Sequence, residues 1–347
     1  MENLNTDFIT MVMDGVGVIE PQPQEETGSD GFISATDLIN REVDEIECLV
    51  EPILPRSVVV ATGGASDTGK SALLRQLCVC LCTGRDFIGF PVNSIHKSAI
   101  YVSTEDDEMA ISFLMRKQNR DFQLHPDELL DLKFIFDTEN LLGNLDAILK
   151  KTPADLVVID CFTDIYGRSM NQANEVRTFL NQFSQLSNKH QCLVMFLHHT
   201  GKKKENDYPS KHNLLGSQAF EAKMRVVFEI RDDLADDRKK HLCIVKGNYL
   251  PADYKKESIV LEFTENLTFR NTGDRCVFDM LVKNDDSKKE KYQRIIELKE
   301  AGMSYQQIAE ELGYKNKSSI SRLIKGYESF QTLPKATEAT EDAMLPF

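Results

Sequence analysis

The sequence predicts an α/β protein with a mostly parallel sheet, and three observations lead to this fold class. Apolar strand patterns alternate with helical patterns over residues 57–197. Over residues 226–270 the strand patterns are joined by polar turns without helices, which predicts antiparallel strands at one edge. A Gly-rich phosphate-loop motif directly follows the first strand. A small all-α helix-turn-helix domain is expected after this sheet.

The predicted elements follow in a regular order. The parallel part is expected to have strands at residues 57–62, 98–103, 133–136, 156–160 and 192–197, and helices at 72–77, 107–119, 141–150 and 174–188. The antiparallel part is expected to have strands at 226–231, 241–246, 258–263 and 267–270. The chain of 347 residues is therefore expected to comprise an acidic flexible N-terminal arm (1–34), an α/β core (35–283), a helical domain (284–330) and a disordered acidic tail (331–347).

Composition narrows the class of protein. The formal net charge of −14 argues against a chain coated all over with nucleic acid, although local basic sites stay open. No apolar run approaches the roughly 20 residues of a membrane span, and the N-terminus is acidic where a signal peptide is basic. We therefore expect a cytoplasmic protein without a membrane partner. Cys78, Cys80 and Cys82 lie two apart on a predicted helix, so they point to opposite faces and do not predict a metal cluster.

Residues 64–71 form a complete Gly-x-x-x-x-Gly-Lys-Ser phosphate loop. The glycines let the backbone N–H groups point at a β-phosphate, Lys70 offers a cation to the β- and γ-phosphates, and Ser71 offers a hydroxyl to Mg²⁺. ATP and Mg²⁺ are the expected cofactors. The expected nucleotide-binding residues are Gly64, Ala65, Ser66, Asp67, Thr68, Gly69, Lys70, Ser71 and Ala72.

Polar side chains at three other strand ends complete the expected site. Asp160 ends the strand Leu-Val-Val-Ile-Asp, which is the Walker B arrangement, and is expected to hold Mg²⁺ beside Ser71. Glu105 ends a neighbouring strand and is the predicted general base. His199 ends a third strand, where a donor could sense the γ-phosphate. A strand-end cap is the alternative for Asp160, and a solvated strand terminus is the alternative for His199.

Several strings at these strand ends resemble the RepA-type hexameric ATPases of the RecA-like superfamily. They are Cys-Leu-Val-Glu-Pro-Ile-Leu-Pro-Arg at 48–56, Ser-Thr-Glu-Asp at 103–106, His-His-Thr-Gly-Lys at 198–202, Leu-Gly-Ser-Gln-Ala-Phe at 215–220 and Val-Lys-Gly-Asn-Tyr at 245–249. The resemblance covers about residues 35–270. It implies a RecA-like P-loop core, a homo-hexameric ring with ATP at each interface, and single-stranded DNA in the central pore.

The same resemblance implies a cation that reaches across the subunit interface to the γ-phosphate, as an arginine finger does. Lys246 is the matching position, and Arg225 is a competing candidate. A strand-end lysine that only extends toward solvent is the alternative for Lys246.

Two loops at the same sheet edge are candidates for contact with DNA. The first, residues 162–174, offers Tyr166 for stacking on a base and Arg168 for a phosphate contact. The second, residues 201–213, contains Lys202, Lys203, Lys204, Lys211 and His212. A solvated lysine run is the alternative for the second loop.

The helical pattern at residues 287–329 predicts a helix-turn-helix. Ser304 is expected to cap the second helix, and the third is expected to begin near Asn316. The expected small core contains Ala309, Leu312, Ile320, Leu323 and Ile324. The segment resembles recombinase-like and sigma-like helix-turn-helix domains, which implies duplex DNA as a partner of Lys315, Lys317, Ser319 and Arg322. A helical hairpin for protein contacts is the alternative.

These expectations combine into an ATP-dependent DNA-binding motor, a RepA-like replicative helicase from a plasmid, phage or mobile element. Other replication or mobilisation proteins are further candidate partners. An ATP-switched DNA-binding regulator or helicase loader without unwinding activity is the second reading. A sequence-specific DNA-binding protein that uses nucleotide only for assembly is the third.

Overall fold

The computed structural model describes residues 32–170, 172–201, 207–214, 218–282, 286–312, 314, 317, 318, 320, 321, 323 and 324. The chain divides into two compact units, with the boundary between Glu45 and Ile46. The first unit contains helix α2 (Ala35–Ile39), whose N-cap Ser34 accepts a hydrogen bond from the backbone N–H of Asp37. The predicted domain boundaries after residues 34, 283 and 330 stay predictions.

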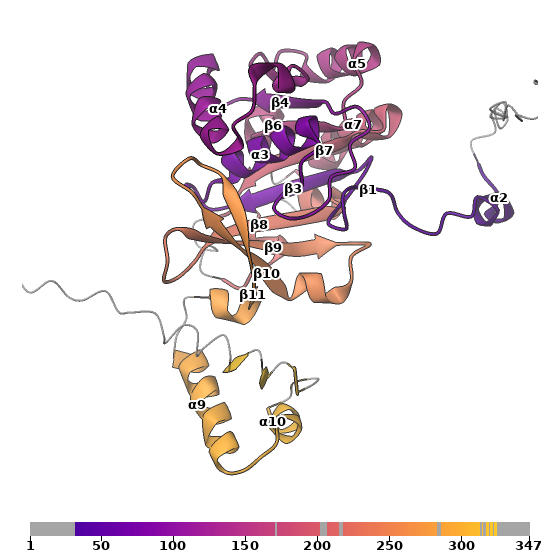
Figure 1. Cartoon of the computed structure of the whole chain (residues 1–347). Coiled ribbons are helices and arrows are strands. Elements are labelled where there is room, and N and C mark those ends of the chain that lie inside the picture. The colour runs from indigo at the N-terminus through magenta and orange to yellow at the C-terminus, as the bar shows by residue number, and fades with distance from the viewer. Residues whose placement is uncertain are drawn as a thin grey trace, which may run out of the picture. The chain divides into compact units, whose positions relative to one another are not determined.

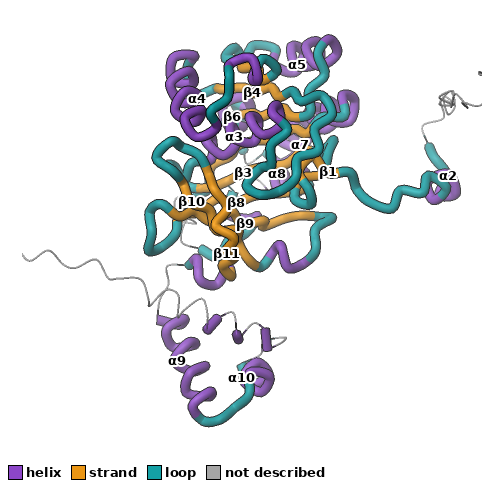
Figure 2. Tube along the Cα trace, in the orientation of Figure 1, coloured by secondary structure: helices purple, strands orange, loops and turns teal. Residues whose placement is uncertain are grey.

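The second unit is built on a nine-stranded sheet within the described residues, with helices packed along it (Figures 1 and 2). Its strands are β3 (Val59–Gly64), β4 (Ala99–Ser103), β5 (Leu132–Ile135), β6 (Leu156–Asp160), β7 (Leu193–His199), β8 (Val226–Asp232), β9 (Lys239–Gly247), β10 (Glu257–Phe263) and β11 (Phe269–Val277). Their order in the sheet is β11-β10-β9-β8-β3-β7-β6-β4-β5. A short antiparallel pair that the sequence did not predict, β1 (Cys48–Val50) with β2 (Leu54–Pro55), precedes it.

The predicted mixture of strand directions is confirmed. Strands β3 to β7 pair in parallel, and β8, β9, β10 and β11 pair in antiparallel with one another. One detail was wrong, because β8 also runs parallel to β3 and therefore belongs to the parallel part. Helix α8 (Gln218–Lys223), which the sequence did not indicate, lies between β7 and β8 and allows this crossover.

Both faces of the parallel part are covered by helices. Val60 packs in a core cluster with helix α3 (Lys70–Thr83), whereas Val59 and Ala61 pack in a second cluster with α5 (Leu141–Lys151), α7 (Ala173–His190) and α8. The strands therefore have apolar side chains on both faces, as buried parallel strands do. The second unit also contains the α-helices α4 (Glu108–Phe122) and α6 (Phe162–Tyr166). Its 3-10 helices are η1 (Pro126–Leu129), η2 (Lys211–Asn213), η3 (Ala252–Lys255) and η4 (Phe278–Leu281).

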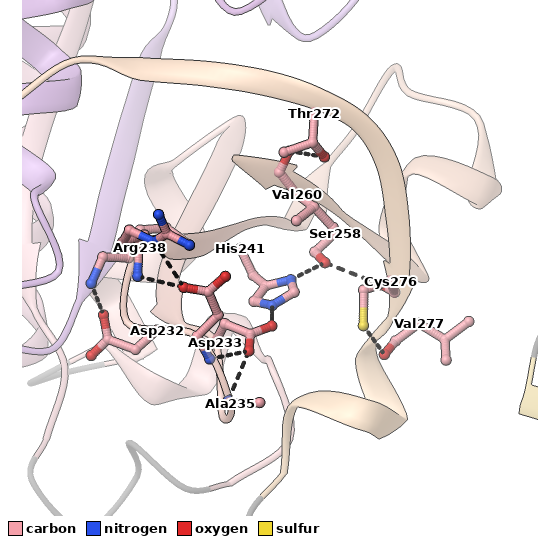
Figure 3. Close-up of polar contacts among 12 residues, drawn as sticks. Asp232, Asp233, Ala235, Arg238, His241, Ser258, Val260, Thr272, Cys276 and Val277 are labelled. Atoms are coloured by element: carbon pink, nitrogen blue, oxygen red, sulfur yellow. Dashed lines mark hydrogen bonds and ion pairs between the residues drawn. The ribbon is translucent and has the colours of Figure 1, made fainter. Parts of the chain in front are cut away.

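A buried histidine ties the antiparallel strands together (Figure 3). Nε2 of His241 on β9 lies 2.8 Å from Oδ2 of Asp233, and its Nδ1 lies 2.9 Å from Oγ of Ser258 on β10. The Ser258 hydroxyl donates to the Cys276 carbonyl on β11 at 3.1 Å. Burial raises the pKa of Asp233, but the bonds from His241 and from the Ala235 N–H outweigh it, so this pKa lies below its ordinary value.

The C-terminal helices have a small core of their own. Helix α9 (Asp286–Glu300) is followed by α10 (Tyr305–Glu311), and Ser304 caps α10 with Gln307 in a capping box, as predicted. The buried cluster is Ile295, Leu298, Ile308, Ala309, Ile320 and Ile324, with Leu312 and Leu323 packed against it. The predicted core residues therefore lie together.

Among the described helices, none has the length and apolar character that a bilayer crossing requires.

Candidate nucleotide site

Two glycines of the phosphate loop are required by close approaches. The loop connects the end of β3 to the start of α3, as predicted. A Cβ atom on Gly64 would lie 2.6 Å from the carbonyl oxygen of Ile230, and one on Gly69 would lie 2.8 Å from Cζ of Phe269. Gly69 also has φ +84°, in the left-handed region that favours glycine. The loop therefore needs glycine at both positions, and it leads directly into the N-terminus of α3, where the first N–H groups of a helix have no partner within it and are suited to phosphate.

Lys70 lies inside this loop. Its side chain is buried, and its Nζ donates to the Ala65 carbonyl at 2.5 Å. Burial lowers the pKa of Lys70, while the charges of Asp160 and Glu105 raise it. The Lys70 ammonium therefore feels the charges of both carboxylates, and its hydrogen-bond partner among the described residues is the Ala65 carbonyl of the loop itself.

Asp160 ends β6 next to β4, with Ser103 as its register partner. The buried hydroxyl of Tyr101 donates to Oδ2 of Asp160, whereas the buried Oδ1 makes no hydrogen bond among the described residues. Burial raises the pKa of Asp160, and the hydroxyls of Tyr101 and Ser71 oppose this shift. An unsatisfied carboxylate oxygen beside a serine hydroxyl fits the oxygen ligands that Mg²⁺ prefers, so Asp160 and Ser71 are the residues that would hold it.

Glu105 lies beside Asp160 at the end of β4. Its Oε1 is 3.4 Å from Nε2 of His199 and accepts a hydrogen bond from the Cys161 thiol at 3.5 Å. Thr104 fixes the neighbouring backbone, since its N–H donates to the Asp160 carbonyl at 2.7 Å. About half of the Glu105 side chain is exposed, so water can reach it. The structure brings the predicted residues Lys70, Glu105, Asp160 and His199 to one edge of the sheet, and their roles stay predictions.

The sequence did not indicate the side chains that support this edge of the sheet. Tyr101 lies on β4 two residues before Ser103, so the two side chains are on the same face of the strand. Its hydrogen bond to Asp160 forms because β4 and β6 are neighbours in the sheet, and the sequence does not give that neighbour order. Burial raises the pKa of Cys161 to about 11. Side chains alternate between the two faces of β4, and this pattern could have placed Tyr101 on the same face as Ser103. No local pattern in the sequence indicated Cys161.

Lys246, the predicted interface cation, is bound within its own chain. Its Nζ donates to the Glu221 carbonyl at 2.7 Å and lies 3.5 Å from the Glu221 carboxylate. The same buried carboxylate lies 3.0 Å from Nζ of Lys211 and 3.5 Å from Nδ1 of His212. Burial lowers the pKa of Lys246, and Glu221 raises it. Arg225, the competing candidate, is exposed.

The first predicted DNA loop is partly wrong. Phe162–Tyr166 forms helix α6, because its apolar side chains at both ends face the core. Tyr166 is buried against Phe162 and Phe179, with ring centroids 5.6 and 5.3 Å apart, so it is not exposed for stacking on a base. Arg168 is exposed and lies 3.4 Å from a Glu175 carboxylate oxygen.

The other expected DNA contacts are mostly outside the described residues. This applies to Lys202, Lys203, Lys204, Lys315, Ser319 and Arg322. Lys317 is described, exposed and helical. The predicted DNA contacts therefore stay predictions.

The mostly parallel sheet, the phosphate loop at the start of α3 and the carboxylates at adjacent strand ends define a P-loop ATPase with a RecA-like core. Residues 24–205 match AAA_25, a family described as an AAA domain, over more than half of the chain. The chain belongs to this AAA-domain family. No curated protein matches it.

Proposed function

We propose that this ATPase is a motor that moves along DNA, a RepA-like replicative helicase of a plasmid, phage or mobile element. The observation that carries the proposal is the grouping of Lys70, Asp160 and Glu105 at one sheet edge, where Asp160 is paired with the strand that Glu105 follows. A protein that only binds nucleotide needs the phosphate loop, but it has no need for a water-accessible carboxylate beside the metal position.

In the proposed reaction, Lys70 and the N–H groups of the loop hold the β- and γ-phosphates of ATP. Asp160 and Ser71 would hold Mg²⁺, which would neutralise charge on the phosphates when bound. Glu105 accepts a proton from the attacking water, and the proposed role of His199, whose Nε2 lies 3.4 Å from Oε1 of Glu105, is to contact the γ-phosphate. The subunits form a hexameric ring on single-stranded DNA.

The C-terminal helices support a second candidate, an ATP-switched DNA-binding regulator or helicase loader. The observation that favours it is the separate apolar core formed by α9, α10, Ile320 and Ile324, together with the exposed Lys317. A small helical unit with its own core and a surface cation is suited to duplex DNA.

Strand displacement measured together with ATP turnover distinguishes the two functions. A helicase displaces a labelled strand from a forked duplex in proportion to ATP consumed, and a loader or regulator hydrolyses ATP without displacement. Lys70→Ala protein is the control, because it lacks the cation that either activity needs. Turnover by wild type equal to that of Lys70→Ala would overturn both proposals.

A further inference from the structure

Three different metal-ligating side chains meet at the strand ends beside the phosphate loop. Glu105 follows β4, Cys161 follows β6, and His199 ends β7. One ligand atom from each lies within 4.8 Å of the other two. Sγ of Cys161 is 3.5 Å from Oε1 of Glu105, and Nε2 of His199 is 3.4 Å from the same oxygen.

We propose that Glu105, Cys161 and His199 form a site for a borderline divalent cation such as Zn²⁺, separate from the Mg²⁺ position at Asp160 and Ser71. Bonds of about 2.3 Å to sulfur and about 2.0 Å to nitrogen or oxygen, at tetrahedral angles, place sulfur about 3.5 Å from oxygen and nitrogen about 3.3 Å from oxygen. Both measured distances to Oε1 agree with these values. The third pair of ligand atoms, Sγ of Cys161 and Nε2 of His199, lies within 4.8 Å, and a movement of the partly exposed His199 ring would bring the two atoms to the distance that a bound ion requires.

The surroundings also suit a bound ion. The Glu105 side chain is 53% exposed, so a cation and a water molecule as fourth ligand can enter from solvent. Oγ1 of Thr163 lies 3.0 Å from Sγ of Cys161, so its hydroxyl can donate to a metal-bound thiolate. Cys161 releases its thiol proton to solvent when the metal binds, and no electrons are transferred.

The donor set selects against Mg²⁺. A thiolate and an imidazole favour Zn²⁺ and related ions, whereas Mg²⁺ prefers oxygen ligands in an octahedral arrangement. Asp160 and Ser71 offer only oxygen. The proposal thus gives this edge of the sheet two sites of different chemistry, one that uses Asp160 and one that uses the next residue, Cys161.

The consequence for turnover rests on the proposed function, in which Glu105 is the base. A cation bound to Oε1 withdraws negative charge from the Glu105 carboxylate and makes it a weaker base toward the attacking water. Zn²⁺ is therefore expected to inhibit ATP hydrolysis. A chelator that removes Zn²⁺ is expected to restore the rate, whereas excess Mg²⁺ is expected not to restore it.

Binding is tested without any activity, using Co²⁺ as a spectroscopic probe on the full chain. Wild type should show a thiolate-to-cobalt charge-transfer band that one equivalent of Zn²⁺ removes. Cys161→Ser should lose the band, His199→Gln should weaken binding by more than about tenfold, and Cys48→Ser, which alters a thiol elsewhere, should behave as wild type. Circular dichroism establishes whether each variant is folded. If Cys161→Ser is unfolded, the metal site is tested by the cobalt affinity of His199→Gln alone. Absence of the band in wild type, or its persistence in both folded site variants, would overturn the metal site.

Turnover forms a separate arm. Cys161→Ser should no longer be inhibited by Zn²⁺, with its own rate in the absence of Zn²⁺ as the reference. Cobalt binding with Zn²⁺-insensitive hydrolysis would uphold the site and refute inhibition through Glu105. If wild type hydrolyses no ATP, the proposed function fails and the cobalt titration still decides the metal site.

Discussion

The ammonium of Lys246 and the carboxylate of Glu221 lie 3.5 Å apart, and the same ammonium donates to the Glu221 carbonyl at 2.7 Å. Lys211 and His212 contact the same carboxylate from the preceding segment. One buried glutamate thus serves cations from β9 and from η2. Lys246 must leave these contacts if it is to reach a neighbouring subunit.

Glu221→Gln should lower the free energy of unfolding by about 1–3 kcal/mol, because the partly buried cations lose their carboxylate. Urea denaturation provides the measurement. Glu297→Gln is the matched control, since Glu297 forms an exposed ion pair with Arg294 and such pairs contribute about 0–1 kcal/mol. Equal losses in the two variants would show that Glu221 is no more important than a surface carboxylate.

The interface cation can be identified by mixing subunits. Lys246→Ala protein should be inactive alone and regain activity when mixed with Lys70→Ala protein, because each mixed interface can combine an intact loop with an intact cation. Arg225→Ala mixed in the same way tests the exposed competitor. Rescue by Arg225→Ala but not by Lys246→Ala would assign the role to Arg225 and leave Lys246 as a structural residue.

Glu105→Gln should bind ATP with near wild-type affinity and lose most hydrolysis, since the amide keeps the shape of the side chain but cannot accept the proton. General-base catalysis contributes about 10²–10⁴-fold, which sets the size of the expected loss in kcat. Nucleotide affinity from equilibrium binding and kcat from phosphate release are measured on the same preparation. Weakened binding with unchanged turnover per bound ATP would remove Glu105 from the base role.

Acid should selectively weaken the contacts of Asp233. Its pKa is lowered in the folded protein, so its stabilising effect is complete above the unfolded value of about 3.9 and disappears as pH falls through the folded value. Asp233→Asn should therefore be less stable than wild type at pH 7, and the difference should shrink below about pH 4. Chemical denaturation of both proteins across this range gives the difference directly. A constant difference at every pH would mean that the His241 contact does not depend on the charge of Asp233.

Removal of the chain from residue 284 onward should leave basal ATP turnover largely intact. It should abolish preferential binding to duplex DNA from the plasmid, phage or mobile element that carries the gene. Phosphate contacts make such binding fall steeply with salt. Mobility-shift titrations of full-length and truncated protein at two salt concentrations are the measurement. Equal duplex affinity for both proteins would support the protein-contact alternative for the C-terminal helices.

Local sequence signals predicted the elements that carry the site residues. The strand, Gly-rich turn and helix around Lys70 are adjacent in sequence, Asp160 ends an apolar strand, and Glu105 lies two residues after the end of another. Contacts that depend on strand order could not be predicted in this way. The hydrogen bond of Tyr101 to Asp160 and the approach of Cys161 to Glu105 join segments about 56–59 residues apart, and the ion pair of Lys246 with Glu221 joins a strand to a helix that the sequence did not indicate.

Strand β3 pairs with β7 and β8, whose residues come much later in the chain: Val59 pairs with Val194, and Ala61 with Val227. During synthesis the phosphate loop therefore leaves the ribosome long before either flanking strand. We expect a nascent chain that ends before residue 193 to be unable to retain ATP, because such long-range pairing has to wait for distant segments. Nucleotide capture would then report the completed sheet, and a cell would not lose ATP to unfinished copies of this enzyme.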